Sequence, residues 1–176
     1  MTVSDAQLKL ISPLIPAGTS VDLNQILALV GANTVNRAAL VIGQLAIESD
    51  YFRVMVEDPS EYAGRAYVPY YGRSWIQLTW LDNYRACGAA INVDLVSNPD
   101  AAVQCNASVC SWFWMKHGLN SFGDNNDCDG CTRAINGPAA TPASLALRAK
   151  YWQRALQVLQ GADPGFLDVT GGSSST

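Results

Sequence analysis

Helical periodicity runs through most of this chain, but the stretch 51–75 cannot be one helix. It contains Pro59, Gly64, Pro69 and Gly72 among several tyrosines, and prolines and glycines at such spacing interrupt helices. The sequence does not alternate strands with helices as a parallel α/β sheet requires. We therefore predict a mainly α fold with a small irregular lobe, including short strands, near 51–75. The predicted helices span residues 5–13, 22–31, 34–48, 78–90, 98–117, 127–136 and 141–161.

The length and composition of the chain fit one globular domain. Of its 176 residues, 49% are hydrophobic and 15% are charged, which suits a single substantial core. A formal net charge of −4 argues against nucleic acid as a partner, because nucleic acid needs clustered lysine and arginine. No apolar run reaches the roughly 18 residues that span a bilayer. We predict one catalytic domain over residues 1–163 and a flexible tail or linker start over 164–176.

The N-terminal segment MTVSDAQLKLISPLIPAG does not resemble a secretory signal. It lacks a basic start and a clean apolar stretch before a small-residue cleavage site. We expect a protein made in the cytoplasm without a recognisable signal peptide, exported by another route or deprived of its leader.

The cysteines and the single histidine offer little catalytic chemistry. The odd number of cysteines leaves at least one free or paired between chains. A zinc site on four of them matches known spacings poorly, and disulfides or inert thiols are favoured. His117 stands at a predicted helix end, where a capping or packing role is favoured, and a multi-histidine metal site is excluded by count. We expect no cofactor. The zinc alternative would use Cys105, Cys110, Cys128 and Cys131, and the fifth cysteine is Cys87.

All three glutamates of the chain, Glu48, Glu57 and Glu61, fall within fourteen positions. If one helix carried Glu48 and Glu57, nine residues at 100° each would place them on opposite faces, about 13 Å apart along the axis. However, Ser49 to Phe52 has the pattern of a helix end, and the following residues alternate as a strand does. A chain that folds back here would bring two carboxylates to one cleft, which is the equipment for inverting glycoside hydrolysis. Solvated surface charge is the alternative interpretation.

Four motifs in series resemble glycoside hydrolase family 19, which includes chitinases and phage endolysins. YYGRSWIQLTWLDNYRACG (70–88) is similar to the family pattern Y-x-GRG-x-IQL-[ST]-x-x-x-NY, and QLAIESDYFRVMVED (44–58) resembles its A-H-E-[ST] segment with a second glutamate nine residues on. NPDAAVQCNASVCSWFWMKHGLN and DCDGCTRAINGP resemble its later motifs, so the likeness runs from about residue 34 to 160. Ile47 replaces the usual histidine, and Ser74 and Trp75 replace a glycine and a small residue or proline.

The resemblance implies a lysozyme-like, two-lobed single domain with a catalytic cleft. It implies Glu48 as the general acid and Glu57 as the general base, with Glu61 as rim charge or an alternative base. A glutamate at a helix end packed by Leu45 and Phe52 can be desolvated, which raises its pKa and retains its proton. A glutamate in a wetter place stays ionised and can activate water.

The resemblance also implies roles for polar and aromatic residues around the glutamates. Thr79 would hold the attacking water, and Asn83, on the same helix face, would bind a sugar N-acetyl group or assist that water. For each of these residues a cap or core role is the alternative. Gln77 and Asn136 would contact sugar hydroxyls, Arg133 would pair with Glu57, Tyr70, Tyr71 and Trp75 would offer flat faces to sugar rings, and Trp80, Trp112, Phe113, Trp114 and Trp152 are assigned to the core.

The substrate expected from the resemblance is a β-1,4-linked polymer of N-acetylhexosamines. The compact form favours an endolysin-type lysozyme that hydrolyses peptidoglycan at the bacterial cell wall. The acidic composition points the other way, because bacterial walls are often anionic themselves. A chitinase is the alternative enzyme, and a catalytically inactive wall-binding module is the alternative of another class. We expect a monomer with a polysaccharide substrate and neither nucleic acid nor membrane as a partner.

Overall fold

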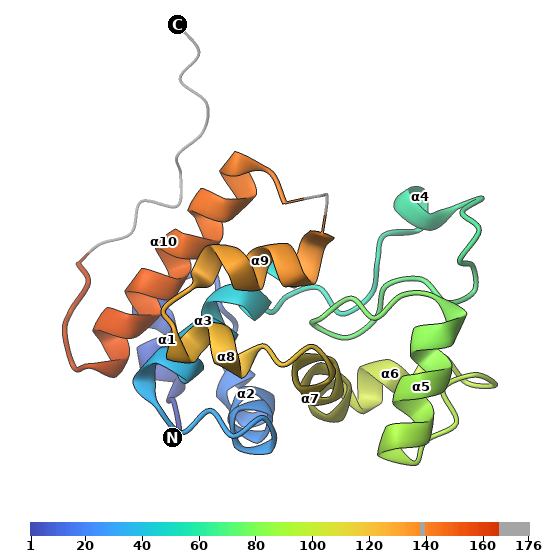
Figure 1. Cartoon of the computed structure of the whole chain (residues 1–176), viewed down its shortest axis with the longest axis horizontal. Coiled ribbons are helices and arrows are strands. Elements are labelled where there is room, and N and C mark those ends of the chain that lie inside the picture. Colours follow the sequence, from blue (N-terminus) through green and yellow to red (C-terminus); the bar gives the residue numbers. More distant parts are fainter. Residues whose placement is uncertain (138–139, 166–176) are drawn as a thin grey trace, which may run out of the picture.

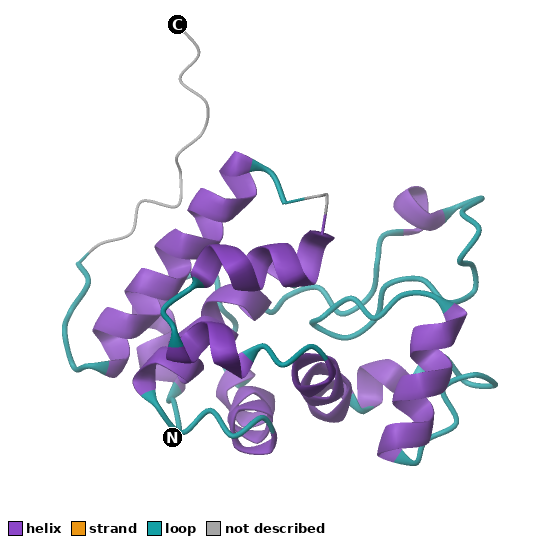
Figure 2. Cartoon of the chain, in the orientation of Figure 1, coloured by secondary structure: helices purple, strands orange, loops and turns teal. Residues whose placement is uncertain are grey.

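The computed structural model describes residues 1–137 and 140–165 and confirms the mainly α prediction (Figures 1 and 2). The predicted tail over 164–176 falls outside the described residues from residue 166 onwards. No helix in the described part is long and apolar enough to cross a membrane. The helices are α1 (Asp5–Ile11), α2 (Thr19–Leu29), α3 (Val35–Glu48), α4 (Pro59–Tyr62), α5 (Leu81–Ile91), α6 (Ala101–Gln104), α7 (Asn106–Lys116), α8 (Asn120–Asp124), α9 (Cys128–Asn136) and α10 (Pro142–Leu159).

The structure divides one predicted helix and adds two short ones. The helix predicted over 98–117 is interrupted at Cys105, which leaves helical geometry with φ −98° and ψ 27° and separates α6 from α7. No glycine or proline marks this interruption, so the sequence carries no signal for it. The short helices α4 and α8 were not predicted, because four or five residues are too few to show periodicity.

Helix α3 is the centre of the larger lobe, which also contains α1, α8, α9 and α10 (Figure 1). All of its side chains from Ala38 to Ala46 are buried, and it packs chiefly against α10 (Figure 1). A Cβ atom at Gly43 would lie 2.8 Å from the backbone nitrogen of Trp152. The glycine therefore allows the two helices to approach closely, which outweighs its cost of about 1 kcal/mol inside a helix.

Helix α10 also fixes α1 to the larger lobe. The buried guanidinium of Arg154 donates to the backbone carbonyls of Leu10 at 2.7 Å and Ile11 at 3.0 Å. These carbonyls are at the C-terminal end of α1, where no further helical turn can satisfy them. The lobe is thus held together by polar contacts as well as by its apolar core.

The smaller lobe is organised around one buried arginine instead of a sheet. Arg73 pairs with Asp100 at 2.7 Å, donates to the hydroxyl of Tyr84 at 3.0 Å, and lies 3.6 Å from the ring centre of Tyr71. Within the described residues, the extended segments here form isolated antiparallel bridges only, from Arg73 to Val56 and to Leu78. The predicted irregular lobe is confirmed, but the short strands predicted in it are replaced by these two bridges. Figure 2 shows the segment as loop around the short α4.

The turn after α3 carries the chain from the larger lobe to the smaller one. Ser49 ends the helix, donating its hydroxyl to the carbonyl of Leu45 at 2.6 Å and accepting from the amide of Phe52 at 2.9 Å. Asp50, Tyr51 and Phe52 all have positive φ, between 47° and 63°, which reverses the chain direction. The predicted helix end directly after Glu48 is therefore confirmed.

Candidate active site

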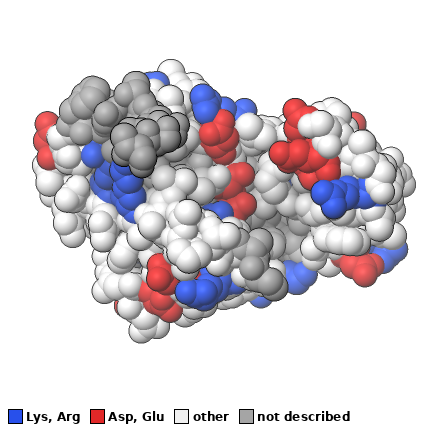
Figure 3. All heavy atoms as spheres, turned by 90° about the horizontal axis from the view of Figure 1, so that it is seen from above, with Lys and Arg blue, Asp and Glu red and all other residues white. Residues whose placement is uncertain are grey.

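Glu48 and Glu57 line one cavity between the two lobes, with a volume of about 530 Å³. The reversal after α3 brings them there although nine residues separate them in the sequence. Figure 3 shows acidic side chains on both walls of a hollow in this face of the molecule. The remaining lining residues are Ile47, Asp50, Val54, Val56, Asp58, Pro59, Glu61 and Gln77.

Glu48 forms an ion pair with an arginine of α10. Arg148 Nη2 donates to Glu48 Oε1 at 2.5 Å, and the side chains of Arg148 and Glu48 are 3% and 15% exposed. Asn136, at the end of α9, completes the contact. With its amide nitrogen toward the carboxylate it donates to Glu48 Oε1 at 2.7 Å and accepts from Arg148 Nη2 at 3.0 Å. Three helices thus hold one carboxyl group in place.

The pKa of Glu48 is raised above its ordinary value. The main cause is burial, which disfavours the charged form, and the charge and hydrogen bond of Arg148 act in the opposite direction. The predicted desolvation of Glu48 is confirmed. A raised pKa suits a carboxyl group to donate a proton to a leaving oxygen.

Arg148 is itself oriented by a buried glutamine. Its Nη1 donates to Gln44 Oε1 at 2.9 Å, and the amide nitrogen of Gln44 donates to Thr132 Oγ1 at 2.9 Å. Gln44 is one turn before Glu48 on α3, so both residues face α10. Because both ends of this fully buried amide have partners, the direction of the guanidinium toward Glu48 is fixed.

Glu57 lies in a different environment on the opposite lobe. Its Oε1 accepts from the hydroxyl of Tyr67 at 2.7 Å, and its Oε2 accepts from the backbone amide of Gly72 at 2.8 Å. A Cβ atom at Gly72 would lie 2.5 Å from Gln77 Oε1, so the glycine of the GRS segment leaves room for the Gln77 side chain beside Glu57. Each carboxylate oxygen of Glu57 keeps a lone pair for a water molecule, as a general base requires.

A second cavity of about 350 Å³ continues the cleft beyond Glu57. It shares Glu57, Glu61 and Gln77 with the first cavity. Gln77 therefore lines both cavities, and its contact with sugar hydroxyls stays a prediction. Glu61 is exposed at the edge of both cavities, as its rim assignment predicts. The further lining residues of the second cavity are Tyr67, Gly72, Thr79 and Trp80.

Thr79 is in this second cavity and is not the N-cap of α5. That position belongs to Trp80, and no side chain caps the helix. The hydroxyl of Thr79 donates to the carbonyl of Gln77 at 2.8 Å, which leaves its lone pairs free to accept from a water molecule. The geometry is compatible with the predicted water-holding role and removes the capping alternative.

Thr79→Val tests this role, because it removes the hydroxyl and nearly preserves the shape. We expect the rate of glycoside hydrolysis to fall by roughly 10- to 100-fold, the scale of one hydrogen bond to a reacting group. The melting temperature should change little, because the substitution removes a single hydrogen bond within the protein, the one to the carbonyl of Gln77. Steady-state rates and thermal melts are measured on the same samples. A variant with the wild-type rate would contradict the role.

Asn83 is engaged by the protein itself. Its amide nitrogen donates to the carbonyl of Thr79 at 2.9 Å, and its Oδ1 accepts from Lys116 Nζ at 3.3 Å. It does not line either of the two cavities described above. Asn83 thus supports the backbone that carries Thr79, and its contact with a sugar stays a prediction. Asn136, also predicted to bind sugar, contacts Glu48 and Arg148 instead.

The aromatic residues predicted to face the sugar are placed differently. Trp75 is 4% exposed and packs edge-on against Phe52 at 4.9 Å, so its assignment to the substrate is wrong. Tyr71 is sandwiched between Tyr62, which stacks on it at 4.0 Å, and the guanidinium of Arg73. Both flat faces of Tyr71 are therefore covered, which contradicts a stacking role. Tyr70 is partly buried, with its hydroxyl directed to the carbonyl of Val96.

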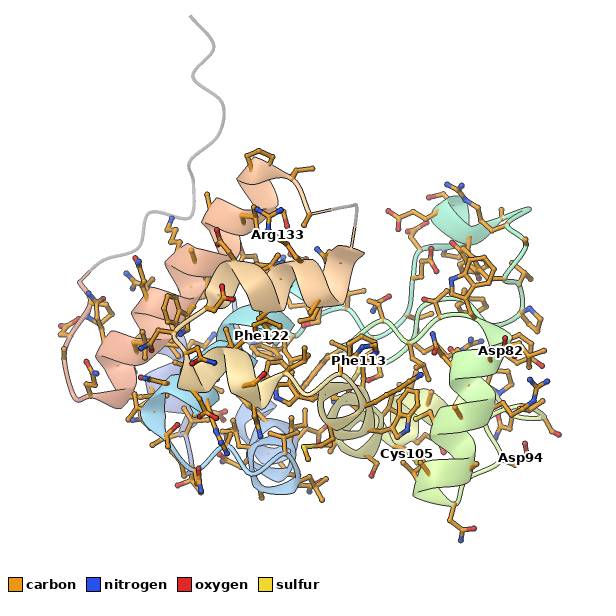
Figure 4. The ribbon with its side chains drawn as sticks, in the orientation of Figure 1. Asp82, Asp94, Cys105, Phe113, Phe122 and Arg133 are labelled. Carbon is orange, nitrogen blue, oxygen red and sulfur yellow. The ribbon has the colours of Figure 1, made fainter. Side chains whose placement is uncertain are left out.

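Arg133 does not pair with Glu57. Its side chain is exposed on α9, and Figure 4 places it on the side of α9 and α10, away from α4 and the smaller lobe. Helix α9 turns Arg133 outwards because Cys131 and Thr132 occupy its buried face. The arginine that pairs with a glutamate in this cleft is Arg148, and its partner is Glu48, not Glu57.

Ser74 explains how one departure from the family pattern is accommodated. It has a positive φ of 68°, a conformation that favours the glycine of the pattern. Its hydroxyl contacts Asn106 Oδ1 at 2.9 Å, and the amide of Trp75 donates to the same oxygen at 3.0 Å. This buried contact compensates for the strained backbone and turns Trp75 into the core.

The cysteines and His117 remain outside the cleft chemistry. All five cysteines lie in the described part of the chain and none is bonded to another. No group of histidine, cysteine and acidic residues among the described positions could hold a metal ion. Burial raises the pKa of Cys128 to about 11, so its thiol is protonated at neutral pH. His117 is the C-cap residue of α7, as predicted.

Four residues of the site were missed by the sequence reasoning. Trp80 is predicted in the core but is exposed, and the motifs assign no role to Tyr67, Gln44 or Arg148. A buried arginine 100 positions from its glutamate has no local sequence signal. For Trp80 a local signal exists, because it directly follows Thr79 in the motif.

A helical two-lobed fold with two carboxylates in the intervening cleft defines the lysozyme-like class. Residues 32–135 match the model of glycoside hydrolase family 19 described as chitinase class I. Because this match covers more than half of the chain, the protein belongs to that family.

Individual relatives are similar to this chain over part of their lengths. Endochitinase B of Zea mays is 37% identical over 109 residues, which are 54% of this chain and 36% of that protein. Inactive chitinase-like protein 1 of Hevea brasiliensis is 45% identical over 49 residues, 26% of this chain and 16% of that protein. The chain thus spans well under half the length of these relatives. The crystal structure of chitinase C from Streptomyces griseus HUT6037 has the same fold, with a TM-score of 0.74 at 24% identity over 92% of this chain and 78% of that one.

Proposed function

We propose that the protein hydrolyses β-1,4 glycosidic bonds in chitin-type polymers of N-acetylglucosamine by single displacement. The observation that carries this proposal is the pair of glutamates in one cavity with opposite environments. Buried Glu48 has a raised pKa and serves as the acid, whereas Glu57 accepts hydrogen bonds from the hydroxyl of Tyr67 and the backbone amide of Gly72 and serves as the base. Acid and base roles are divided when the environments of two carboxyl groups differ in this way.

The charge of the cleft supports chitin over peptidoglycan as the substrate. Asp50, Asp58 and Glu61 line the same cavity as the two catalytic glutamates. Peptidoglycan carries carboxylates on its peptides, so it would be repelled by these walls, whereas chitin is neutral. The family description and the names of the matched chitinases also favour chitin. An endolysin-type lysozyme acting on peptidoglycan is the second candidate, suggested by the close spacing of Glu48 and Glu57 in the sequence.

An inactive binding module is the candidate from another class, since a matched relative is named an inactive chitinase-like protein. The presence of both glutamates with separate hydrogen-bond partners argues for catalysis. A module that only binds glycan has no need for a buried carboxyl group with a raised pKa.

The test combines substrate choice with stereochemistry. The protein is incubated separately with chitin oligomers and with purified peptidoglycan, and new reducing ends are identified by mass spectrometry. We expect products from chitin, and the first-formed product in NMR spectra should be the α-anomer, because single displacement inverts the β-linked centre. A β-anomer would remove Glu57 from the role of base. New ends from peptidoglycan alone would select the lysozyme alternative, and no products from either polymer would select the binding module.

A further inference from the structure

Trp80 is an exposed aromatic residue held in the cleft by an unfavourable backbone conformation. Trp80 as a residue is 54% exposed, unlike Trp75 and Trp114, which are almost fully buried. Its φ is +77°, a region that bulky residues rarely adopt and that costs of the order of 1–3 kcal/mol. A residue that is both strained and exposed gains little from packing, so its contribution to folding does not explain its position.

The backbone around Trp80 maintains this conformation. The amide of Trp80 donates to the carbonyl of Tyr70 at 2.9 Å, and the carbonyl of Trp80 accepts from the amides of Asn83 and Tyr84 at 3.1 Å each. These bonds attach the start of α5 to the smaller lobe. They hold the indole at the mouth of the second cavity, whose lining includes Trp80.

Trp80 is also connected to the base through Tyr67. The ring of Tyr67 meets the indole edge-on, with 5.3 Å between centroids and 70° between planes. The hydroxyl of Tyr67 donates to Glu57 at 2.7 Å. Tyr67 therefore contacts both the indole of Trp80 and the carboxylate of Glu57. Gln77 and Glu61 line the same cavity and supply polar groups near the ring.

We propose that Trp80 is a stacking platform for one sugar ring of the polymer, in a subsite beside Glu57. A β-1,4-linked hexopyranose with equatorial substituents presents a flat face of C–H groups, which complements the face of an indole. The polar groups at its edge match Gln77 and Glu61, and sites of this kind combine an apolar surface with a few oriented polar groups. This inference rests on the proposed function and adds the residue that binds the sugar next to the base.

Binding is measured separately from turnover by introducing all changes into the Glu48→Gln variant. Chitohexaose and a peptide-free glycan strand of peptidoglycan are titrated calorimetrically. We expect Trp80→Ala to weaken binding by roughly 10-fold, the scale of removing one aromatic side chain from a binding surface, and Trp80→Phe to retain most of the affinity. The quenching or shift of tryptophan fluorescence on addition of glycan should diminish in the Phe variant.

Trp80→Gly separates a binding role from a structural one. Glycine adopts positive φ without cost, so this variant should melt at the same temperature as the parent or higher, while it binds glycan as weakly as Trp80→Ala. Met115→Ala is the control, because Met115 is similarly exposed, at 55%, on α7 and does not line either cleft cavity. It should leave the affinity unchanged.

The outcomes distinguish the platform from the proposed function. If the parent binds glycan and the Ala and Gly variants bind equally well, the platform is overturned and the function stands. A lower melting temperature with unchanged affinity would likewise make Trp80 a structural residue only. If the parent binds neither glycan, both the function and the platform are overturned.

Discussion

Glu48→Gln should lose at least about 10²-fold in turnover, because general acid catalysis contributes about 10²- to 10⁴-fold. Glutamine has no proton to donate to the leaving oxygen at this position. Its Oε1 can still accept from Arg148 and Asn136, so we expect a folded protein with a lower melting temperature. Rates on chitin oligomers and circular dichroism of the same preparation test both statements.

The matched control is Glu61→Gln. Glu61 lines the same cavity but is exposed at its edge, and we expect its replacement to be nearly silent. A Glu48→Gln variant with more than half of the wild-type rate would remove Glu48 from the role of acid. A loss as large in Glu61→Gln as in Glu48→Gln would assign chemistry to the rim carboxylate.

Among the substitutions proposed for the cleft, Arg148→Met should produce the largest loss of stability. It leaves Glu48 buried without its partner, and breaking a buried ion pair from one side typically costs about 3–5 kcal/mol. For a chain of this length we expect the melting temperature to fall by roughly 10 °C at neutral pH. Thermal melts between pH 4 and pH 7 provide the measurement.

The destabilisation by Arg148→Met should depend on pH in a defined direction. Removing the charge and hydrogen bond of Arg148 leaves burial unopposed, so the pKa of Glu48 rises further above its ordinary value of about 4.3. Between the unfolded and folded pKa values the folded state binds more protons, so stability decreases as pH rises. The loss should therefore be smallest near pH 4 and larger at pH 7. The basic limb of the activity profile should move to higher pH.

Arg154→Met is the control for this pH dependence. Arg154 is also a buried arginine of α10, but it donates to backbone carbonyls of α1, which do not titrate. Its replacement should destabilise the protein by a similar amount at pH 4 and pH 7. Equal pH dependence in both variants would show that Glu48 is not the titrating partner of Arg148.

The sequence by itself determined most of the longer helices and the turn that creates the site. Periodicity and end signals placed α3 with its end at Glu48, and the glycines, prolines and tyrosines of 51–75 excluded a continuous helix. These properties are local, because they depend on neighbouring residues and backbone preference. The four motifs in series added the family and identified both glutamates.

Only the tertiary structure decided which side chains meet across the cleft. Arg148 pairs with Glu48 although 100 positions separate them in the sequence. Arg133 is closer to the glutamates in the sequence, but it faces outwards because α9 buries Cys131 and Thr132. Trp75 and Trp80 have similar sequence surroundings, yet one is in the core and the other lines the cleft. The physical reason is that the hydrophobicity of a residue does not specify the direction in which its side chain points. The positive φ values of Ser74, Gln77 and Trp80 turn these side chains to different sides, and only the packing of the two lobes imposes those angles.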